Sequence, residues 1–469
     1  MRERFLMPVL IVLLSVAPPL EGEEPSLASL SFLQEAALTV PTLKSSSQFG
    51  WSAALSGDGN TALIGAIGEE ACPNDPQATC RAAYVFVRAG GVWSLEARLP
   101  GGGFEFGDEV ALSADGNVAL VHDRSLPCPS SGGLNCGGVV VFVRSGGGWV
   151  PETTILSPTF ADFEYGAFGS SLALSADGSI ALIGKNAENC VLQPCLGAVY
   201  VFTRGAGGVW TQEAHIVPSE PDVNFGIAVA LSGDGSIALF GSPLTDCAAA
   251  GESCGAVFAF SRSGGAWSPQ QKLTASDPVF RGAFGSSVAL SADGNVALIG
   301  APNIELFGTE AGSVFIFNRE GGVWTEKREI PLGEPGEGVG RAVSLSGDGG
   351  TLLAGGPAAS CAEGVECGEA LWSVFRAGIW TSPQPLTQFG ANDLGGFALA
   401  LSADGRTALV TAPRGPCADG TSSCGIAYVF TLAPLGLEIP ALDGLGLTLL
   451  AILLAASGAA LLARRRRSA

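Results

Sequence analysis

The sequence is poor in histidine and in charge. Among its 469 residues there are 2 His, and only 14% of the residues are charged. So few histidines leave little material for acid–base chemistry near neutral pH. No G-x-S-x-G, H-E-x-x-H, phosphate-loop or dinucleotide-binding pattern occurs in the context that its chemistry requires. The sequence therefore predicts no enzyme: no catalytic residue, no cofactor and no resident metal.

Basic residues are also scarce. The chain has 24 Lys and Arg against 44 Asp and Glu, which gives a net charge of −20. Six of the arginines lie at the two ends, at Arg2, Arg4 and in the run 464–467. The remaining body is strongly acidic and repels a phosphate backbone, so we predict that nucleic acid is not a partner.

Both ends carry targeting patterns. Residues 1–22 combine a basic tip, an apolar core and then Pro and small residues, as a signal peptide does, with an uncleaved anchor helix as the alternative. Residues 445–463 form an uncharged apolar run that is long enough to cross a bilayer as a helix, with a buried core helix as the alternative. The basic tail 464–469 follows directly. The positive-inside rule places this tail in the cytoplasm and the body outside it.

A short motif precedes the apolar run, within a linker at 433–444. It consists of Ile439, Pro440, Ala441 and Leu442. Followed by an apolar span and a basic tail, it resembles the IPTL-type C-terminal sorting signals of Gram-negative bacteria, with Ala441 in place of the usual Thr. Those signals are related to signals handled by exosortase-like membrane proteases. The resemblance implies a processing enzyme of that kind as a partner.

The motif LS-[AG]-DG occurs seven times, at intervals of 55 to 62 residues. A period near 57 residues suits a four-stranded β unit with one long loop. Asp-Gly between two apolar runs predicts a two-residue hairpin turn in which both residues have positive φ. The turn aspartates are Asp58, Asp115, Asp177, Asp234, Asp293, Asp348 and Asp404.

The fifth repeat shows the unit most clearly. Apolar runs at 284–291, 295–302 and 312–319 are followed by Gly-Gly, a Trp and the segment 325–332, which predicts four strands. The first three runs hardly alternate with polar residues, which predicts burial on both sheet faces. The first run of each repeat is rich in Ala, Ser and Gly, as expected for inner strands that crowd around a channel.

The seventh repeat lacks the G-x-W corner that introduces the fourth strand in the other six. Residues 31–41 match residues 209–219, with Phe32 in the place of Trp210. We therefore predict an all-β, seven-bladed β-propeller over 30–432, closed by an N-terminal strand and followed by a C-terminal transmembrane helix. The closing strand would remove two open sheet edges. The blades are predicted to start near 49, 106, 168, 225, 284, 339 and 395.

Five repeats begin with Phe-Gly, at Phe49, Phe106, Phe168, Phe225 and Phe284, and GAP follows at 300–302. On these residues the chain resembles the FG-GAP repeat family, whose propeller repeats also occur in integrin α-chains. Many repeats of that family hold Ca²⁺ in a D-x-D-x-D-G loop. Here the loop has shrunk to S-[AG]-D-G, and one carboxylate in a tight turn cannot provide six or more oxygen ligands. We therefore predict no Ca²⁺ in these turns.

The cysteines form six couples with four to seven residues between partners, each between the second and third predicted strands of a repeat. Together with the signal peptide, this regularity predicts six local disulfides. Zinc is the alternative, but the couples stand in separate repeats with no His beside them. The couples are Cys72 with Cys80, Cys128 with Cys136, Cys190 with Cys195, Cys247 with Cys254, Cys361 with Cys367, and Cys417 with Cys424.

The two histidines differ in context. His122 takes the place of a Gly at the end of a second strand, and with Asp123 it suggests either acid–base chemistry or a polar pair at the rim. We favour the rim pair. His215 lies in a fourth strand, where we expect it to be exposed.

The cysteine loops and the blade-to-blade connections share one face of the predicted ring. Variable loops on a rigid scaffold are a common place for recognition. We therefore expect an exported, membrane-anchored protein of the cell envelope or surface, acting as a non-catalytic binding or adhesion scaffold. Its partner would be an extracellular or envelope protein or glycan, held by the disulfide-braced loop face. The alternatives are a hydrolase or lyase with its site at the channel mouth, and a purely structural surface protein.

Overall fold

The computed structural model describes residues 30–434, apart from 44–45, 73–74, 102–105, 129–134, 159–166, 187–195, 219–223, 247–252, 279–281, 303–311, 333–337, 363, 387–388 and 418–422. The predicted signal peptide, sorting motif, membrane span and basic tail lie outside the described residues. Within the described part of the chain, no helix is both long and apolar enough to cross a membrane.

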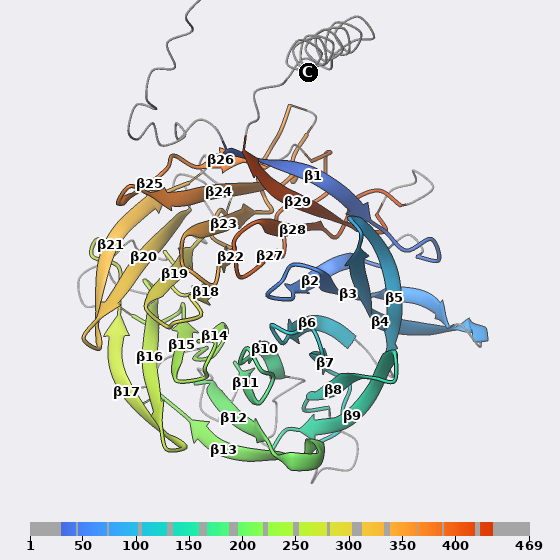
Figure 1. The fold of residues 1–469 in the computed structure, drawn as a ribbon, viewed down its shortest axis with the longest axis horizontal. Coiled ribbons are helices and arrows are strands. Elements are labelled where there is room, and N and C mark those ends of the chain that lie inside the picture. The colour runs from blue at the N-terminus through green and yellow to red at the C-terminus, as the bar shows by residue number, and fades with distance from the viewer. Residues whose placement is uncertain are drawn as a thin grey trace, which may run out of the picture. The chain divides into compact units, whose positions relative to one another are not determined.

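The described residues form seven antiparallel sheets arranged in a ring around a common axis (Figure 1). Each sheet is one blade. Its first strand is nearest the axis, and these inner strands are β2 (Phe49–Leu55), β6 (Phe106–Leu112), β10 (Phe168–Leu174), β14 (Val229–Leu231), β18 (Ser287–Leu290), β22 (Ala342–Leu345) and β27 (Leu399–Leu401). The second strands are β3 (Thr61–Cys72), β7 (Val118–Asp123), β11 (Ile180–Lys185), β15 (Ile237–Ser242), β19 (Val296–Ala301), β23 (Thr351–Gly356) and β28 (Thr407–Ala412).

The third strands are β4 (Asp75–Ala89), β8 (Gly138–Ser145), β12 (Ala198–Arg204), β16 (Ala256–Ser263), β20 (Ser313–Glu320), β24 (Glu369–Arg376) and β29 (Ile426–Pro434). The outer strands are β5 (Val92–Pro100), β9 (Gly148–Leu156), β13 (Trp210–Ile216), β17 (Ala266–Leu273), β21 (Val323–Pro331), β25 (Ile379–Trp380) with β26 (Gln384–Pro385), and β1 (Leu30–Leu38). A short 3₁₀ helix, η2 (Ala206–Gly208), precedes β13.

The seventh blade has the strand order β1-β29-β28-β27, so the N-terminal strand is its outer strand, as predicted (Figure 1). Phe32 of β1 is buried and makes an edge contact with Trp372 of blade six, with 5.2 Å between ring centroids. On the other side, Glu35 forms an ion pair of 2.8 Å with Arg88 of blade one. One strand therefore connects blades six, seven and one and closes the ring.

Burial follows the sequence pattern. The second strands β7, β11, β15, β23 and β28 are buried at every residue, because each lies between neighbouring blades. The outer strands keep many exposed side chains, as β13 shows. The hydrophobic clusters span two adjacent blades; one joins Phe49 and Tyr84 of blade one to Leu409 and Val429 of blade seven. Burial of apolar surface between blades is therefore the main source of stability.

The DG turns differ from the prediction. Gly59 has φ 68°, but Asp58 does not have a positive φ, so the turn is not the expected two-residue type. Instead the Gly59 N–H donates to the Ser56 carbonyl and the Ser56 N–H donates to the Thr61 carbonyl. Four residues thus lie between the paired Ser56 and Thr61. By contrast, both Gly90 and Gly91 of the first Gly-Gly corner have positive φ.

Side chains explain the longer turn. The Ser56 hydroxyl donates to Asp58 Oδ1 at 2.5 Å and accepts hydrogen bonds from the N–H groups of Asn60 and Thr61. Asp58 Oδ1 also accepts from the Asn60 N–H at 2.9 Å. The Ser-to-Asp contact recurs in all seven blades. The turn is therefore closed by two side chains, and the Asp carboxylate has a structural role there.

Candidate ligand site in the central channel

At one end of the channel, main-chain groups of neighbouring blades are hydrogen-bonded to one another. At the DG turns, the residue between Ser and Asp donates its N–H to the carbonyl of the equivalent residue in the next blade. An added Cβ at Gly57 would lie 3.2 Å from the Ala114 Cβ, so small residues are needed here. Six links of this kind, of 2.8–3.0 Å, run from Gly57 to Ala114, Ala114 to Ala176, Ala176 to Gly233, Gly233 to Ala292, Ala292 to Gly347 and Ala403 to Gly57.

At the other end the channel widens into a cavity of about 640 Å³. This is the end at which the inner strands begin, so by the antiparallel topology it opens toward the cysteine loops. The volume lies within the roughly 300–1,000 Å³ of small-molecule sites. All seven blades line it with the two residues that follow the Phe-Gly position: Trp51 and Ser52, Asp108 and Glu109, Ser170 and Ser171, Ile227 and Ala228, Ser286 and Ser287, Arg341 and Ala342, and Phe397 and Ala398.

A bulge in the inner strand brings two consecutive residues to the cavity. In blade two, Phe106 pairs with Asp123 and Val110 pairs with Val121, so three residues of β6 lie opposite one residue of β7. Consecutive residues of a regular strand would point to opposite faces. The extra length of β6 allows both Asp108 and Glu109 to line the cavity.

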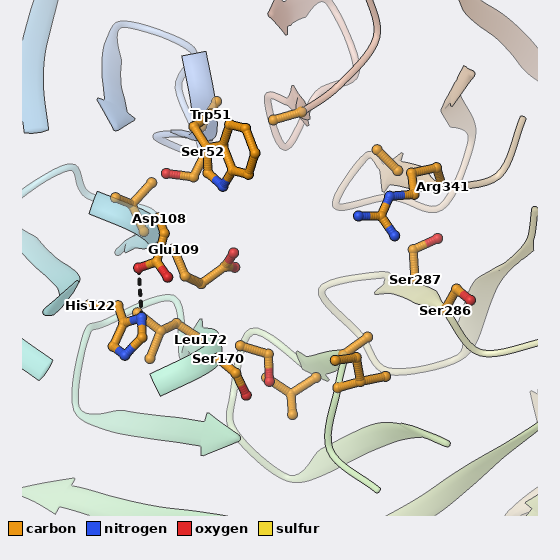
Figure 2. Close-up of a pocket in the computed structure, with 18 of the residues that line it drawn as sticks. Trp51, Ser52, Asp108, Glu109, His122, Ser170, Leu172, Ser286, Ser287 and Arg341 are labelled. Atoms are coloured by element: carbon orange, nitrogen blue, oxygen red, sulfur yellow. Dashed lines mark hydrogen bonds and ion pairs between the residues drawn. The ribbon is translucent and has the colours of Figure 1, made fainter. Parts of the chain in front are cut away.

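Asp108 is held by His122. The Nδ1 atom of His122 lies 2.6 Å from Asp108 Oδ1, so the imidazole N–H donates to the carboxylate (Figure 2). The His122 side chain is 1% exposed and that of Asp108 is 19% exposed. The buried ring thus fixes a carboxylate that still meets the water of the channel.

The prediction of a rim pair between His122 and Asp123 was wrong. His122 is buried, and it stands where five of the other six second strands have a Gly and β28 has Thr411. Its ring packs against the start of blade three, since a Cβ added at Gly169 would lie 2.4 Å from it. Asp123 bonds elsewhere and accepts hydrogen bonds from the Ser125 N–H and hydroxyl. The two residues are separated because neighbours along a strand point to opposite faces.

His215 of β13 is exposed, as predicted, and its ring stacks on Tyr200 with 4.3 Å between centroids. It lies on an outer strand of blade three, whereas the cavity is lined by the inner strands.

Glu109 lies beside Asp108 and points into the cavity (Figure 2). The pKa of Glu109 is raised to about 8, mainly by desolvation in the channel and secondly by the negative charge of the neighbouring Asp108. The Leu172 N–H, which bonds to the Glu109 carboxylate, opposes this rise. At neutral pH Glu109 is therefore mostly protonated and offers a hydrogen-bond donor next to the acceptor oxygens of Asp108.

The facing wall has the opposite charge. Arg341 of blade six lies across the cavity from Asp108 and Glu109, and its guanidinium points inward (Figure 2). Arg341 is exposed to the channel and forms no ion pair with any described residue. Trp51 adds an aromatic surface to the wall, where its ring lies 4.6 Å from that of Phe397.

These residues depart from the expectation of inner strands that are rich in Ala, Ser and Gly. Sequence reasoning missed Asp108, Glu109, Arg341 and Trp51 because each was taken as part of an inner strand of small residues. A signal was present, since each departs from the repeat at one of the two positions after Phe-Gly. In the described part of the chain, no group of three His, Cys, Asp or Glu side chains is placed to hold a metal.

Three of the predicted disulfides are formed among the described residues: Cys128–Cys136, Cys361–Cys367 and Cys417–Cys424. Cys254 is also disulfide-bonded, whereas its predicted partner Cys247 lies outside the described residues. The disulfide prediction is therefore confirmed for these three couples.

The other two predicted disulfides are not seen in the described part of the chain. The side chains of Cys72 and Cys80 lie outside the described residues, although the main chain places Cys80 of β4 opposite Glu70 of β3 rather than opposite Cys72. Both Cys190 and Cys195 lie outside the described residues as well. The bonds from Cys72 to Cys80 and from Cys190 to Cys195 therefore stay predictions.

The second cysteine of a couple contacts the next blade. The carbonyl groups of Cys136, Cys254, Cys367 and Cys424 accept hydrogen bonds of 2.8–3.1 Å from the N–H groups of Phe168, Phe284, Gly395 and Phe49, respectively. All four cysteines are buried. The disulfides thus attach the loops to the junctions between blades, around the open end of the cavity.

The ring of seven antiparallel blades defines the class of fold: the protein is a seven-bladed β-propeller. The FG-GAP repeat family matches residues 32–86 and 267–317, each of which runs from an outer strand into the next blade. No curated protein matches the chain. One similar solved structure is that of a "putative 6-phosphogluconolactonase" from Bacteroides uniformis ATCC 8492. It is 17% identical, with a TM-score of 0.48, and the match covers 72% of this chain and 87% of that one.

Proposed function

We propose that this FG-GAP propeller is an exported binding protein that recognises an envelope or extracellular glycan or protein through its loop face, centred on the mouth of the cavity. One observation carries the proposal: the polar and aromatic departures from the repeat converge on a single cavity at that face. The turn face, in contrast, repeats one hydrogen-bonded turn in every blade. Recognition requires such differences between blades, which the turn face does not offer.

Export and anchoring belong to the same proposal. The disulfides support an oxidising compartment, because such bonds are rare in the cytosol. The signal-peptide pattern at 1–22, the apolar run 445–463 and the basic tail give the route out of the cytoplasm and the attachment to a membrane. An exosortase-like enzyme acting at 439–442 remains part of this proposal.

The experiment compares the two faces. Full-length protein is immobilised and tested for retention of purified envelope polysaccharide and of the envelope protein fraction. In one variant, residues 362–366 between Cys361 and Cys367 are replaced by two glycines. The matched control is Asn295→Lys on the turn face. We expect the loop variant to lose most of the retained material and the control to keep it.

The loop variant also loses the hydrogen bonds that the Asn392 and Leu394 N–H groups donate to Val365 and Glu366. We therefore expect a lower but still cooperative melting transition for the loop variant and an unchanged one for the control. Equal retention by all three proteins would refute the proposal.

A second candidate, a hydrolase or lyase at the channel mouth, is favoured by one observation. A carboxyl group that is mostly protonated at neutral pH, Glu109, stands next to the carboxylate Asp108. Such a pair can divide the roles of general acid and base. Turnover of glycoside substrates by the wild type, lost in Glu109→Gln, would favour this candidate. Binding without turnover would favour the binding protein.

A further inference from the structure

The cavity presents three kinds of chemistry to one small ligand. Arg341 offers a cation on one wall, Asp108 and Glu109 offer an acceptor and a donor on the facing wall, and Trp51 offers an aromatic surface (Figure 2). No single repeat supplies this set, since the groups come from blades one, two and six.

We propose that the cavity binds one acidic sugar, a uronic acid residue, with its carboxylate on Arg341, its hydroxyl groups on Asp108 and Glu109, and its ring against Trp51. The proposal rests on the proposed function and specifies the ligand class for the same site.

Arg341 is suited to the carboxylate. A guanidinium binds a carboxylate through two parallel N–H···O bonds, which favours a planar anionic group over a single hydroxyl. Because no described acidic side chain pairs with Arg341, its hydrogen-bond donors are available to a ligand. The cavity thus offers an anion site inside a protein whose net charge is −20.

The facing wall is suited to hydroxyl groups. His122 fixes Asp108 through the 2.6 Å contact, so the carboxylate is positioned before a ligand arrives. Asp108 accepts hydrogen bonds from hydroxyls, and protonated Glu109 donates to them. A ligand that is only an anion would leave the free hydrogen-bonding positions of Asp108 and Glu109 unused. Arg124 also lines the cavity.

Trp51 supplies the remaining surface. Its ring is half-buried and packs beside Phe397, which orients it in the wall. The C–H groups of a sugar ring are apolar enough to pack on an aromatic face, while the hydroxyls at the ring edge keep polar partners. This combination of an aromatic surface and paired polar groups favours a sugar acid over a small aliphatic acid.

The size and charge of the site limit how much sugar enters. The cavity of about 640 Å³ has room for a small ligand, and its lining stops short of the DG turns. The acidic body also repels an extended polyanion. The geometry therefore fits the end of an acidic glycan, with the rest of the glycan meeting the loop face.

The test is calorimetric titration of the full-length protein with glucuronate and galacturonate, with glucose and galactose as neutral controls and acetate as the control for a bare carboxylate. We expect binding of at least one uronate and at least about 10-fold weaker binding of the corresponding neutral sugar and of acetate. Equal binding of uronate and neutral sugar, or of uronate and acetate, would overturn the proposal, as would no binding of any of them.

Variants locate the site. Arg341→Gln should weaken uronate binding at least about 10-fold, whereas Arg406→Gln, on the turn face, should leave it unchanged. Trp51→Leu should weaken it about 5-fold and should abolish any ligand-induced change in Trp fluorescence that arises from this ring. Melting temperatures close to that of the wild type exclude misfolding as the cause. Uronate binding that survives Arg341→Gln intact would refute the assigned site.

The pH dependence provides an independent readout. Affinity for the uronate should fall as the pH rises through about 8, because ionised Glu109 loses its donor and adds a second negative charge. Glu109→Gln should remove this dependence. If uronates do not bind but the loop-face variant still loses retention of envelope material, the ligand class is wrong and the proposed function stands. If uronates bind but retention does not depend on the loops, the ligand class is right and the proposed function of the loop face is wrong.

Discussion

The turn face and the cavity use carboxyl groups of the same inner strands and hairpins in opposite ways. At the turn face, burial alone would raise the pKa of the Asp carboxyl. Hydrogen bonds from the Ser hydroxyl and from the residue two positions after the Asp outweigh burial and lower the pKa below its ordinary value. This holds for Asp58, Asp115, Asp177, Asp234 and Asp293. In the cavity, burial and a neighbouring charge raise the pKa of Glu109 to about 8.

The difference separates structure from recognition within one repeat. A carboxylate whose hydrogen bonds are satisfied by its own turn stabilises that turn and has little left for a ligand. A carboxyl group held neutral in a channel costs stability, and such groups are common at functional sites. Carboxylates bonded within their own turns thus lie at one end of the channel, and carboxyl groups that face the cavity lie at the other.

The largest effect is expected from a substitution in the apolar packing between blades, on which both faces depend. Phe284 is buried in a hydrophobic cluster with Leu239 and Val257 of blade four. It also makes edge contacts with Phe315 and Phe317 of its own blade, at 5.2 and 6.0 Å between centroids.

Phe284→Ala should lower the free energy of unfolding by about 3–5 kcal/mol, measured by urea denaturation. Phe375→Ala, at a side chain 47% exposed, is the control and should change it little. Equal losses in the two variants would show that burial between blades does not dominate.

An intermediate loss of stability is expected from the serines, and it should differ between the turn face and the cavity. The buried Ser291 hydroxyl donates to Asp293 and accepts from two N–H groups, whereas the Ser287 hydroxyl, at the cavity, makes one bond, to the Gly340 carbonyl. Ser291→Ala should cost about 1–3 kcal/mol of unfolding free energy, and Ser287→Ala about 1 kcal/mol or less. The thermal midpoints report both. A larger loss at Ser287 would reverse the assignment of the turn face as the more stabilising one.

The carboxyl groups act through the pH dependence of stability, with opposite signs at the two ends of the channel. The pKa of Asp293 is lower in the folded than in the unfolded state, so its ionised form stabilises the fold. This stabilisation is complete above the unfolded-state pKa and is lost as the pH falls through the folded-state pKa. Asp293→Asn should therefore make the stability less sensitive to acid. The raised pKa of Glu109 means that wild-type stability falls between pH 4.5 and about 8, and Glu109→Gln should remove that loss.

Melting curves from pH 3 to 9 check both signs. Asp293→Asn should differ from the wild type mainly in its response to acid, and Glu109→Gln mainly above pH 5. If both variants shifted the profile in the same direction, the two carboxyls would not occupy opposite environments.

Much of the architecture can be predicted from the sequence, because seven copies of one pattern each indicate the same four-stranded unit. The match of 31–41 to 209–219 predicted the closing strand, and the structure adds a physical reason, since Glu35 pairs with Arg88 as Glu213 pairs with Arg262. The turn type was missed because Asp-Gly in sequence does not reveal that a serine hydroxyl two residues earlier accepts two N–H groups.

The cavity was harder to predict for two reasons. A regular strand would have sent Asp108 and Glu109 to opposite faces, and only the bulge opposite β7 places them together. His122 meets Asp108 across a strand pair, 14 residues apart in sequence, whereas the neighbouring Asp123 was the obvious partner. Departures from the repeat mark the site, but their convergence requires the ring.

The closing strand has a consequence for how the molecule is made. Glu35 and its hydrogen-bond partner Thr431 are 396 residues apart in sequence. Synthesis runs from the N-terminus, so β1 emerges long before β29 exists, and its pairing edge must wait unsatisfied while six blades assemble. Completion is thus the last event of biogenesis, and a chain truncated before residue 426 would retain an adhesive edge that quality-control proteases and chaperones can distinguish from the finished ring.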